Sequence, residues 1–244
     1  MYGTVPGAGV ELAYEESGSG QPIVLVHDMA SDLEAVRPLA DTLAPRARVI
    51  SYSRRGYGGS TAPEPYAGTT VMEQAEDLAA LLVARNARGA VGVGLGLGAL
   101  IVLDVLTRHP GALSVAVLSD TPLFAFVSDA ARALSDERVL IETAVRDGGP
   151  AAGVVAWLSE RSAACSSARA EQAHQAFFAD YAGLASWPST RSGLRAITVP
   201  AAVVTTPGAP GHVIAASDAL AALLPHARRD RGGDVAGAAA ALLP

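Results

Sequence analysis

Apolar and polar positions along the chain define two alternating kinds of segment. Short runs rich in apolar and β-branched residues recur at Ile23–Val26, Val49–Tyr52, Val91–Val93, Val115–Leu118 and Ala202–Thr205. The intervals between the first four runs contain longer segments compatible with amphipathic helices: Asp32–Leu43, Thr70–Asn86 and Gly98–Arg108. Continuous apolar strands that alternate with amphipathic helices predict a parallel sheet with helices on both faces. We therefore expect an α/β fold.

The two ends and one interior stretch depart from this alternation. Val10–Leu12 and Ala13–Glu16 predict an antiparallel hairpin that leads into the sheet. From Thr121 to about Ser192 the strand pattern stops, and the stretch predicts several helices. The alternation then resumes, with a helix, a short strand and a helix expected at Ala215–Leu224, Arg228–Arg231 and Val235–Leu243. We expect one domain over residues 1–244, with a helical cap inserted at 121–192.

The helical insertion is rich in aromatic side chains. It holds all four phenylalanines, both tryptophans and one tyrosine. Most of these side chains are expected in the core of the insertion, but their number also suits the underside of a cap over an apolar pocket. The residues expected to line such a pocket are Phe124, Phe126, Trp157, Phe178 and Tyr181.

Composition narrows the class of partner. Half of the 244 residues are apolar and 17% are charged, which is typical of a globular protein. A net charge of −6 without a basic cluster argues against nucleic acid as a partner. The longest apolar run, Ala90–Leu103, is too short to span a bilayer, and the first residues lack the features of a signal peptide. We expect a cytoplasmic protein that acts on a small molecule or a modified peptide, without nucleic acid or membrane as a partner.

Two residue types limit the chemistry. All eighteen basic residues are arginine, and the absence of lysine excludes Schiff-base chemistry. The single cysteine, Cys165, excludes an intramolecular disulfide and provides no metal-ligand spacing, so we interpret it as an inert thiol. We expect neither a cofactor nor a metal ion.

Three motifs resemble those of the α/β-hydrolase superfamily. Ile23–Met29 resembles the strand ending in His-Gly that opens these proteins, and Arg55–Ser60 matches their R-G-x-G-x-S loop. Val91–Gly98 stands where the family has a strand, a sharp elbow and a helix with the motif G-x-S-x-G. The motifs follow the family's order and spacing, and the resemblance covers nearly the whole chain outside the insertion. It implies an α/β-hydrolase fold.

The departures from the family pattern concern the catalytic positions. The resemblance places Gly96 at the position of the nucleophile, Pro210 at that of the acid and Asp234 at that of the histidine. A Ser-His-acid mechanism needs an activated hydroxyl, a base and a group that orients the base. None of these stands at its expected place, so ester hydrolysis is disfavoured. A triad rebuilt around His212 or His226 is a minor alternative.

The resemblance also implies an oxyanion hole, which is formed by backbone N–H groups. In this sequence the donors would be the N–H groups of Met29 and Leu97. Backbone donors do not depend on side-chain identity, and Gly96 is expected to leave room beside them for a substrate group. An anion-binding pocket without a nucleophile suits an enolate better than a tetrahedral adduct.

Two carboxylates are candidates for acid–base chemistry at this pocket. Asp28 replaces the glycine of the usual His-Gly pair, and Asp234 replaces the histidine of the triad. Each has a structural alternative, because Asp28 can cap a turn ahead of Ser31–Asp32 and Asp234 can cap the last helix. His27 is a third candidate, although the histidine at this place is more often structural in the family.

The glycines at the elbow allow a competing interpretation. Gly94–Ala99 also fits G-x-G-x-x-A between a strand and a helix, and Asp120 follows after the next strand, as in a dinucleotide-binding fingerprint. The two preceding strand–helix units carry hydrolase-type loops, and these favour the hydrolase interpretation.

The missing catalytic residues also suggest a type of reaction. The sequence is similar to atypical, triad-less α/β-hydrolase-like enzymes of natural-product pathways, the group that includes the bottromycin peptide epimerase. This resemblance implies that a proton is removed and returned at a carbon next to a carbonyl, on a ribosomally made, modified peptide (RiPP). The alternatives are an inert pseudo-hydrolase that binds a small molecule, and a weak hydrolase that uses a displaced histidine.

Overall fold

A computed structural model describes residues 1–128, 130–161, 167–184 and 187–243, and Cys165 lies outside these ranges. The core is an eight-stranded sheet of order β1-β2-β4-β3-β5-β6-β7-β8. Its strands are β1 (Tyr2–Pro6), β2 (Glu11–Ser17), β3 (Pro22–Val26), β4 (Arg48–Tyr52), β5 (Ala90–Leu95), β6 (Leu113–Ser119), β7 (Ala201–Val204) and β8 (Ala227–Asp230). β2 pairs antiparallel with β1 and β4, and all other neighbours are parallel. The structure therefore confirms the expected α/β fold.

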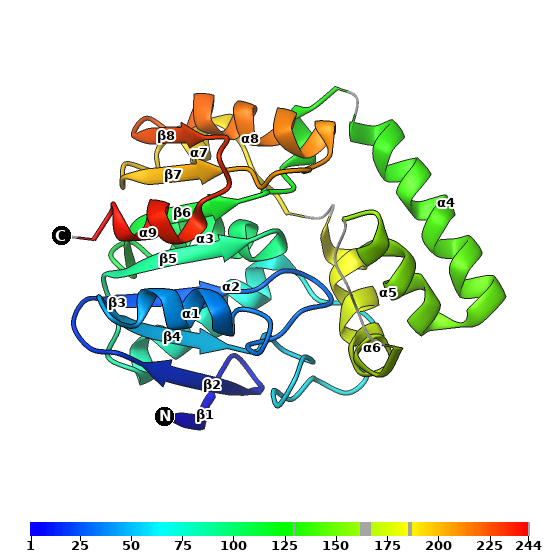
Figure 1. Ribbon diagram of the computed structural model, residues 1–244, viewed down its shortest axis with the longest axis horizontal. Helices are drawn as coiled ribbons and strands as arrows, with labels where there is room; N and C mark the ends of the chain where they lie inside the picture. The colour runs from blue at the N-terminus through cyan, green and yellow to red at the C-terminus, as the bar shows by residue number, and fades with distance from the viewer. Residues whose placement is uncertain (129, 162–166, 185–186, 244) are drawn as a thin grey trace.

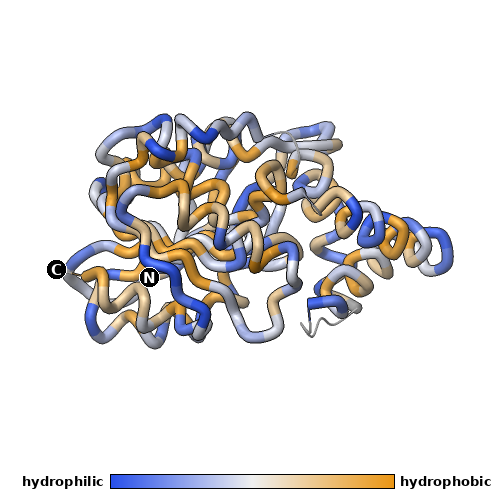
Figure 2. The backbone as a smooth tube through the Cα atoms, turned by 90° about the horizontal axis from the view of Figure 1, so that it is seen from above, coloured by the Kyte–Doolittle hydropathy of each residue, from blue (hydrophilic) through white to orange (hydrophobic). Residues whose placement is uncertain are grey.

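Helices cover both faces of the sheet (Figure 1). They are α1 (Arg37–Leu43), α2 (Val71–Ala84), α3 (Leu97–Arg108), α7 (Arg191–Arg195), α8 (Gly211–Leu223) and α9 (Val235–Ala240). Alternate residues of β3 serve the two cores: Ile23 and Leu25 pack with α1 and α9, whereas Val24 and Val26 pack with α2 and α3. Figure 2 shows the same arrangement, with apolar segments concentrated in the interior.

The elements deviate from the sequence predictions at several boundaries. The predicted hairpin is wrong, because residues 11–17 form the single strand β2, whose antiparallel partner is β1. The first helix begins at Arg37 and not at Asp32, since residues 33–36 form turns. α2 begins where predicted, after Thr70, whose hydroxyl accepts a hydrogen bond from the Glu73 N–H in a capping box.

The described part of the insertion contains helices and no strand. It comprises the short helix η1 (Phe124–Phe126) and the helices α4 (Ala130–Gly148), α5 (Pro150–Ser159) and α6 (Ser167–Gly183). α4, α5 and α6 pack on one another beyond the carboxyl ends of the parallel strands (Figure 1). None of the helices in the described ranges is long and apolar enough to span a membrane.

Glycine is required where α3 crosses the sheet. A Cβ at Gly98 would lie 2.1 Å from the carbonyl oxygen of Val26, and one at Gly94 would lie 2.5 Å from the backbone of Ala99. Both contacts are with backbone atoms, which cannot move aside without displacing a strand or a helix. The alternating glycines of this segment therefore allow α3 to pack closely against β3 and β5.

We expect the Gly98→Ala variant to unfold more easily than the wild type, by about 1–3 kcal/mol. Urea denaturation followed by circular dichroism measures this difference. Gly68→Ala is the matched control, because nothing lies within 4 Å of its Cβ and its φ is not in the left-handed region. The control should change the free energy of unfolding by less than about 0.5 kcal/mol. Equal stability of both variants would contradict the packing role of Gly98.

Candidate active site

The site is centred on the sharp turn that joins β5 to α3. Gly96 forms this turn with φ 52° and ψ −120°, a backbone conformation that residues with a side chain rarely adopt. Its N–H donates to the carbonyl oxygen of Ser119 at 2.9 Å, which ties the turn to the end of β6. The chain therefore keeps the strained geometry of a nucleophile elbow while carrying glycine at its tip.

The carboxyl group of Asp28 fills the space above Gly96. Asp28 follows β3, and a Cβ built on Gly96 would lie 2.0 Å from the Asp28 Cγ and 2.1 Å from each of its carboxyl oxygens. No side chain fits at residue 96 unless Asp28 moves. The volume that a nucleophile would take at this turn is thus occupied by a carboxyl group from a neighbouring strand end.

Asp28 also accepts hydrogen bonds from the two N–H groups that the sequence predicts as an oxyanion hole. The N–H groups of Met29 and Leu97 both donate to Asp28 Oδ1, at 2.7 and 2.8 Å. The two donors expected from the sequence thus converge on one oxygen atom, and that atom belongs to the protein. The expectation that Gly96 leaves room there for a substrate group is wrong, because Asp28 takes that room.

Two opposing effects act on the acidity of Asp28. Burial raises the pKa of its carboxyl above the ordinary aspartate value. The N–H groups of Leu97 and Met29 and the positive charges of Arg161 and Arg54 lower the pKa, but the upward shift prevails. The residue keeps partial exposure, and Oδ2 has no hydrogen-bond partner among the described residues. Oδ2 is therefore the oxygen available for proton exchange.

His27 has no free ring nitrogen. Its side chain is fully buried, Nδ1 lies 2.7 Å from the backbone oxygen of Asp28, and Nε2 accepts from the Arg54 N–H at 2.9 Å. The ring also meets the edge of Tyr57 at 5.2 Å between centroids. Burial lowers the pKa of His27 well below its ordinary value, so the ring is neutral. Both ring nitrogens of His27 are thus engaged with backbone, which favours the structural role over the catalytic one.

The neutral state of His27 makes stability sensitive to acid. The unfolded chain protonates this residue below about pH 6.5, whereas the folded chain does not. The unfolded state then binds one more proton, so the free energy of unfolding should fall by about 1.4 kcal/mol per pH unit below that value. Urea denaturation between pH 4.5 and 7 measures the slope. His27→Gln should reduce it by this amount, and an unchanged slope would show that His27 is protonated in the fold.

Asp234 caps the last helix. It is exposed, and its carboxylate accepts a hydrogen bond from the Gly237 N–H at 2.7 Å, which caps the start of α9. Among the described contacts, no hydrogen bond or ion pair links Asp234 to Asp28. The structure thus shows the capping alternative, and it places Pro210 directly before the first residue of α8.

The two histidines considered for a displaced triad lie at opposite ends of the parallel strands, His226 before β8 and His212 after β7. The carbonyl of the exposed His226 pairs with the N–H of Ala201 at the start of β7, far from the elbow. His212 lies in the first turn of α8, and its ring is 5.3 Å from that of Phe124. Burial lowers the pKa of His212. In the described ranges neither imidazole forms a hydrogen bond with a hydroxyl or a carboxylate.

The insertion contributes charged groups that the sequence did not single out. Arg161 donates from Nη2 to Glu137 Oε2 at 2.6 Å, and its guanidinium lies 3.8 Å from the centroid of the Trp157 ring. Its positive charge acts on Asp28 across the gap between the insertion and the sheet. Burial and the neighbouring Glu137 raise the pKa of Tyr181 to about 12. A cation of the insertion therefore acts on the carboxyl group beside the elbow.

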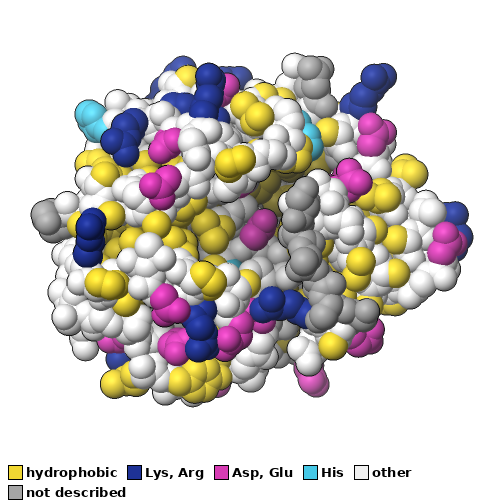
Figure 3. Space-filling view, viewed as in Figure 1, with side chains coloured by type: hydrophobic (Ala, Val, Ile, Leu, Met, Phe, Trp, Pro, Cys, Tyr) yellow, Lys and Arg dark blue, Asp and Glu magenta, His cyan; other side chains and the backbone are white. Residues whose placement is uncertain are grey.

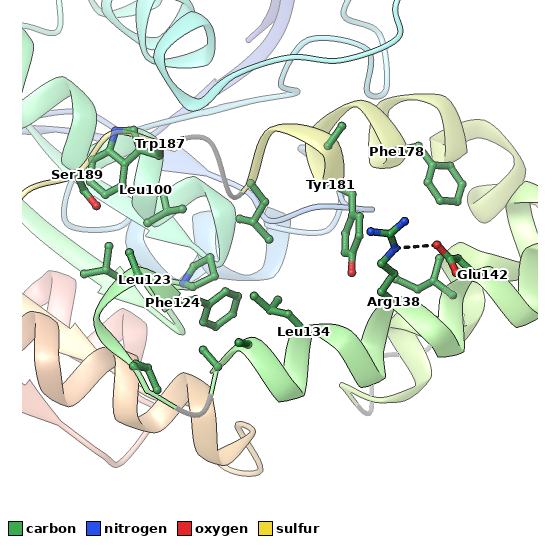
Figure 4. A pocket seen from close by; sticks show the side chains of 18 residues that line it. Leu100, Leu123, Phe124, Leu134, Arg138, Glu142, Phe178, Tyr181, Trp187 and Ser189 are labelled. Carbon is green, nitrogen blue, oxygen red and sulfur yellow. Dashed lines mark hydrogen bonds and ion pairs between the residues drawn. The ribbon is translucent and has the colours of Figure 1, made fainter.

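An apolar cavity of about 750 Å³ lies between the insertion and the sheet (Figure 4). It reaches the core at Leu100, one helical turn after Gly96, and the Arg138–Glu142 ion pair lies in its wall. Gly96 and Asp28 are not among its lining residues. The face of the molecule drawn in Figure 3 has a hollow in which hydrophobic and acidic side chains are visible. The cavity is therefore a neighbour of the elbow.

The structure places the five predicted pocket aromatics in two environments. Phe124, Phe178 and Tyr181 line the cavity, as predicted. Phe126 does not, and instead lies under the guanidinium of Arg191 at 4.8 Å. Trp157 does not line it either, because it is buried at 2% exposure.

Trp187 lines the cavity and is not among the residues predicted to do so. Its indole N–H donates to the carboxylate of the buried Asp104 at 2.8 Å, which fixes the ring in the wall. The sequence shows Trp187 as the second tryptophan of the insertion, but its position in the sequence does not tell in which direction the side chain points.

Comparison with known proteins identifies the family. The model of the alpha/beta hydrolase family matches residues 23–242, and the chain belongs to this family. An uncharacterized hydrolase of Bacillus subtilis, YraK, is 32% identical over 115 residues, which are 47% of this chain and 42% of that protein. The chain thus matches less than half the length of this curated relative.

Solved structures show the same fold. An alpha/beta hydrolase from Sphaerobacter thermophilus has a TM-score of 0.74 at 24% identity, over 93% of this chain and 91% of the other. A thermophilic esterase from Thermogutta terrifontis, solved with malate bound, has a TM-score of 0.72 at 23% identity, over 94% and 89% of the two chains. The dinucleotide-binding interpretation of Gly94–Ala99 is therefore wrong. In addition, Asp120 binds Thr206 through both carboxylate oxygens.

Proposed function

We propose that this family member works without a Ser-His-acid triad and removes and returns a proton at a carbon next to a carbonyl, as an epimerase or isomerase. The observation that carries the proposal is the carboxyl of Asp28, which replaces a nucleophile above Gly96 and accepts two backbone hydrogen bonds. A carboxylate in this position is suited to proton transfer, whereas the turn offers no hydroxyl to form an acyl-enzyme.

In the proposed reaction Asp28 is the acid–base group. Oδ2 takes the proton from the substrate carbon, and the electron pair of the broken C–H bond moves into the carbonyl to form an enolate. Water on the opposite face then donates a proton to the carbon, and the hydroxide that forms takes the proton from Asp28, which restores the carboxylate and the water. The raised pKa of Asp28 brings it closer to the working pH of a general base. No other reagent is consumed.

The negative charge of the enolate needs a partner other than the oxyanion hole. Both hole donors are engaged with Asp28 Oδ1, which holds the base in place. We assign the stabilising role to Arg161, because its charge acts on the same carboxyl and its guanidinium is held by the Trp157 ring. The sequence-based picture of an enolate in the hole is thereby revised.

The proposed substrate is a small molecule or a modified peptide with an apolar group. The supporting observation is the neighbouring cavity, whose walls include Phe124, Phe178, Tyr181 and Trp187. We propose that residues 121–192 act as a cap over one α/β-hydrolase-like domain of residues 1–244. The cavity would hold the apolar group and Asp28 would meet the reacting carbon.

Deuterium incorporation tests this function. The protein is incubated in D2O with a panel of short peptides and N-acylated amino-acid amides that carry apolar side chains, and mass spectrometry records exchange at the α-carbon. We expect a gain of one mass unit in at least one probe, together with loss of its optical activity. Heat-inactivated protein is the control. Absence of exchange from a probe that demonstrably binds would contradict the proposal.

A ligand-binding protein without catalysis is the second candidate, and the filled oxyanion hole favours it too. Such a protein would raise its melting temperature with a probe of the same panel but exchange no deuterium. The third candidate, a weak hydrolase, predicts turnover of p-nitrophenyl acetate that depends on His212. We expect no such turnover above the rate in buffer, and activity lost in His212→Ala would overturn the proposal that the triad is absent.

A further inference from the structure

The guanidinium of Arg54 lies behind the oxyanion hole with every donor engaged. Its side chain is 1% exposed. Nε donates to the His27 carbonyl at 3.1 Å, and Nη2 donates to the Asp28 carbonyl at 3.0 Å. The remaining N–H groups bond to Gln74 and to both carboxylate oxygens of Asp180. An arginine held by five hydrogen bonds has a single orientation.

The hydrogen bond from Arg54 to the Asp28 carbonyl is linked to the hole by a single peptide group. The Asp28 carbonyl and the Met29 N–H belong to the same planar peptide group. At one end the carbonyl accepts from Arg54 and from His27 Nδ1, and at the other the N–H donates to Asp28 Oδ1 at 2.7 Å. A cation at the carbonyl fixes the plane of the peptide and draws electron density away from the nitrogen, which makes the N–H a stronger donor.

Arg54 is in turn held by the insertion. Asp180 lies in α6, is fully buried, and forms an ion pair with Arg54 at 2.8 Å. Its other contacts are with Gln74 Nε2 at 2.8 Å and the Tyr57 hydroxyl at 2.7 Å, and that hydroxyl accepts from the Ala30 N–H. The carboxylate of one insertion residue thus organises the whole segment around Asp28.

We propose that Arg54 and Asp180 are positioning residues, through which the insertion orients and polarises the Asp28–Met29 peptide and so sets the strength of one donor of the oxyanion hole. The proposal concerns the hole itself and holds whether or not the exchange reaction is found. Arg161 is the other charged group that acts on Asp28, and it remains unchanged in every variant below.

The Leu97 N–H is the second donor of the hole and serves as an internal reference for the Met29 N–H. The Leu97 N–H donates to the same Asp28 oxygen at 2.8 Å. The carbonyl of its peptide group, that of Gly96, accepts only from the Ala99 N–H at 3.0 Å among the described contacts, and no cation touches it. A change in the Asp28 carboxyl alters both amides, whereas the hydrogen bond from Arg54 to the Asp28 carbonyl acts on the Met29 amide in addition, so its loss should alter Met29 more than Leu97.

Amide NMR spectroscopy of the full chain at pH 7 tests the proposal. Arg54→Lys keeps the charge but has three donors in place of the five that Arg54 uses, and Asp180→Asn removes the negative charge of the Arg54 partner. In both variants we expect the Met29 proton signal to move upfield more than that of Leu97. We also expect Met29 hydrogen exchange to accelerate roughly 2- to 10-fold relative to Leu97, as for loss of one ordinary hydrogen bond.

Asp77→Asn is the matched control. Asp77 forms an equally buried pair with Arg55, at 2.7 Å, and is expected to destabilise the fold without changing the Met29–Leu97 difference. If the single variants do not fold, Arg54→Met combined with Asp180→Leu replaces both charges with apolar groups. A Met29 signal that follows Leu97 in all folded variants, or that shifts equally in Asp77→Asn, would overturn the proposal.

Discussion

Deuterium exchange by the Asp28→Asn variant is expected to be slower than that of the wild type by on the order of 10²–10⁴-fold, the usual contribution of a positioned acid–base group. Asparagine has the shape of aspartate, and its side-chain oxygen can still accept from the Met29 and Leu97 N–H groups. It cannot take up a proton. The loss would therefore be a loss of chemistry with the hole intact.

The control for this variant is Asp234→Asn. Asp234 is exposed and caps α9, and asparagine is an equally good helix cap. Exchange should stay within about twofold of the wild type, because the residue has no described contact with Asp28. Equal losses in both variants, or none in Asp28→Asn, would remove Asp28 from the mechanism.

Restoring serine at the elbow is expected to destabilise the protein. In Gly96→Ser the new Cβ would lie 2.0 Å from the Asp28 Cγ, so the carboxyl must leave its two hydrogen bonds. A residue with a side chain in this backbone conformation adds about 1–3 kcal/mol of strain. We expect a total decrease of about 3 kcal/mol or more in the free energy of unfolding, since charged hydrogen bonds contribute about 1.5–3 kcal/mol each.

Removing Asp28 should relieve this clash. The double variant Gly96→Ser, Asp28→Gly restores the residues that the family has at both positions, and we expect it to be more stable than the sum of the two single changes predicts. The interaction energy in this double-mutant cycle should be about 1–3 kcal/mol. Urea denaturation of the four proteins measures it. Strict additivity would mean that Asp28 does not occupy the space above residue 96.

The fold could be predicted because short sequence patterns mark its strands and helices, and these patterns follow one another in the order typical of the family. Apolar runs such as Ile23–Val26 became strands, and the helical pattern predicted from Thr70 became α2. The two hole donors could be assigned because they are backbone groups at fixed places in the family pattern. The N-terminal hairpin was misassigned because the partner strand, Tyr2–Pro6, has a weak apolar pattern and is largely exposed.

The filled oxyanion hole could not be predicted from either residue alone. Asp28 and Gly96 are far apart in sequence, and their contact depends on the direction of one side chain after β3. The signal lay in the pair, because the chain has Asp28 where the resemblance implies glycine and Gly96 where it implies serine. The larger side chain at residue 28 fills the space that the smaller residue at 96 leaves, and this is a sign that the two residues are in contact.

The interior of the insertion was less predictable. Its aromatic residues could be identified in the sequence. The sequence pattern of a helix does not tell which face of that helix lies against the cavity. Trp157 is therefore buried within the insertion while Trp187 lines the wall. The pairing of Arg54 with Asp180 joins residues 126 positions apart and carries no sequence motif.

The pH titration of the Met29 and Leu97 amide signals, followed together with the Asp28 side-chain carbon by NMR between pH 3 and 8, tests the central claim most directly. If the Asp28 carboxyl occupies the oxyanion hole, both amides and the carboxyl carbon should change with one shared midpoint above about pH 3.9, the ordinary aspartate pKa. Amide signals that do not follow the carboxyl would show that the hole is empty, and would contradict the account.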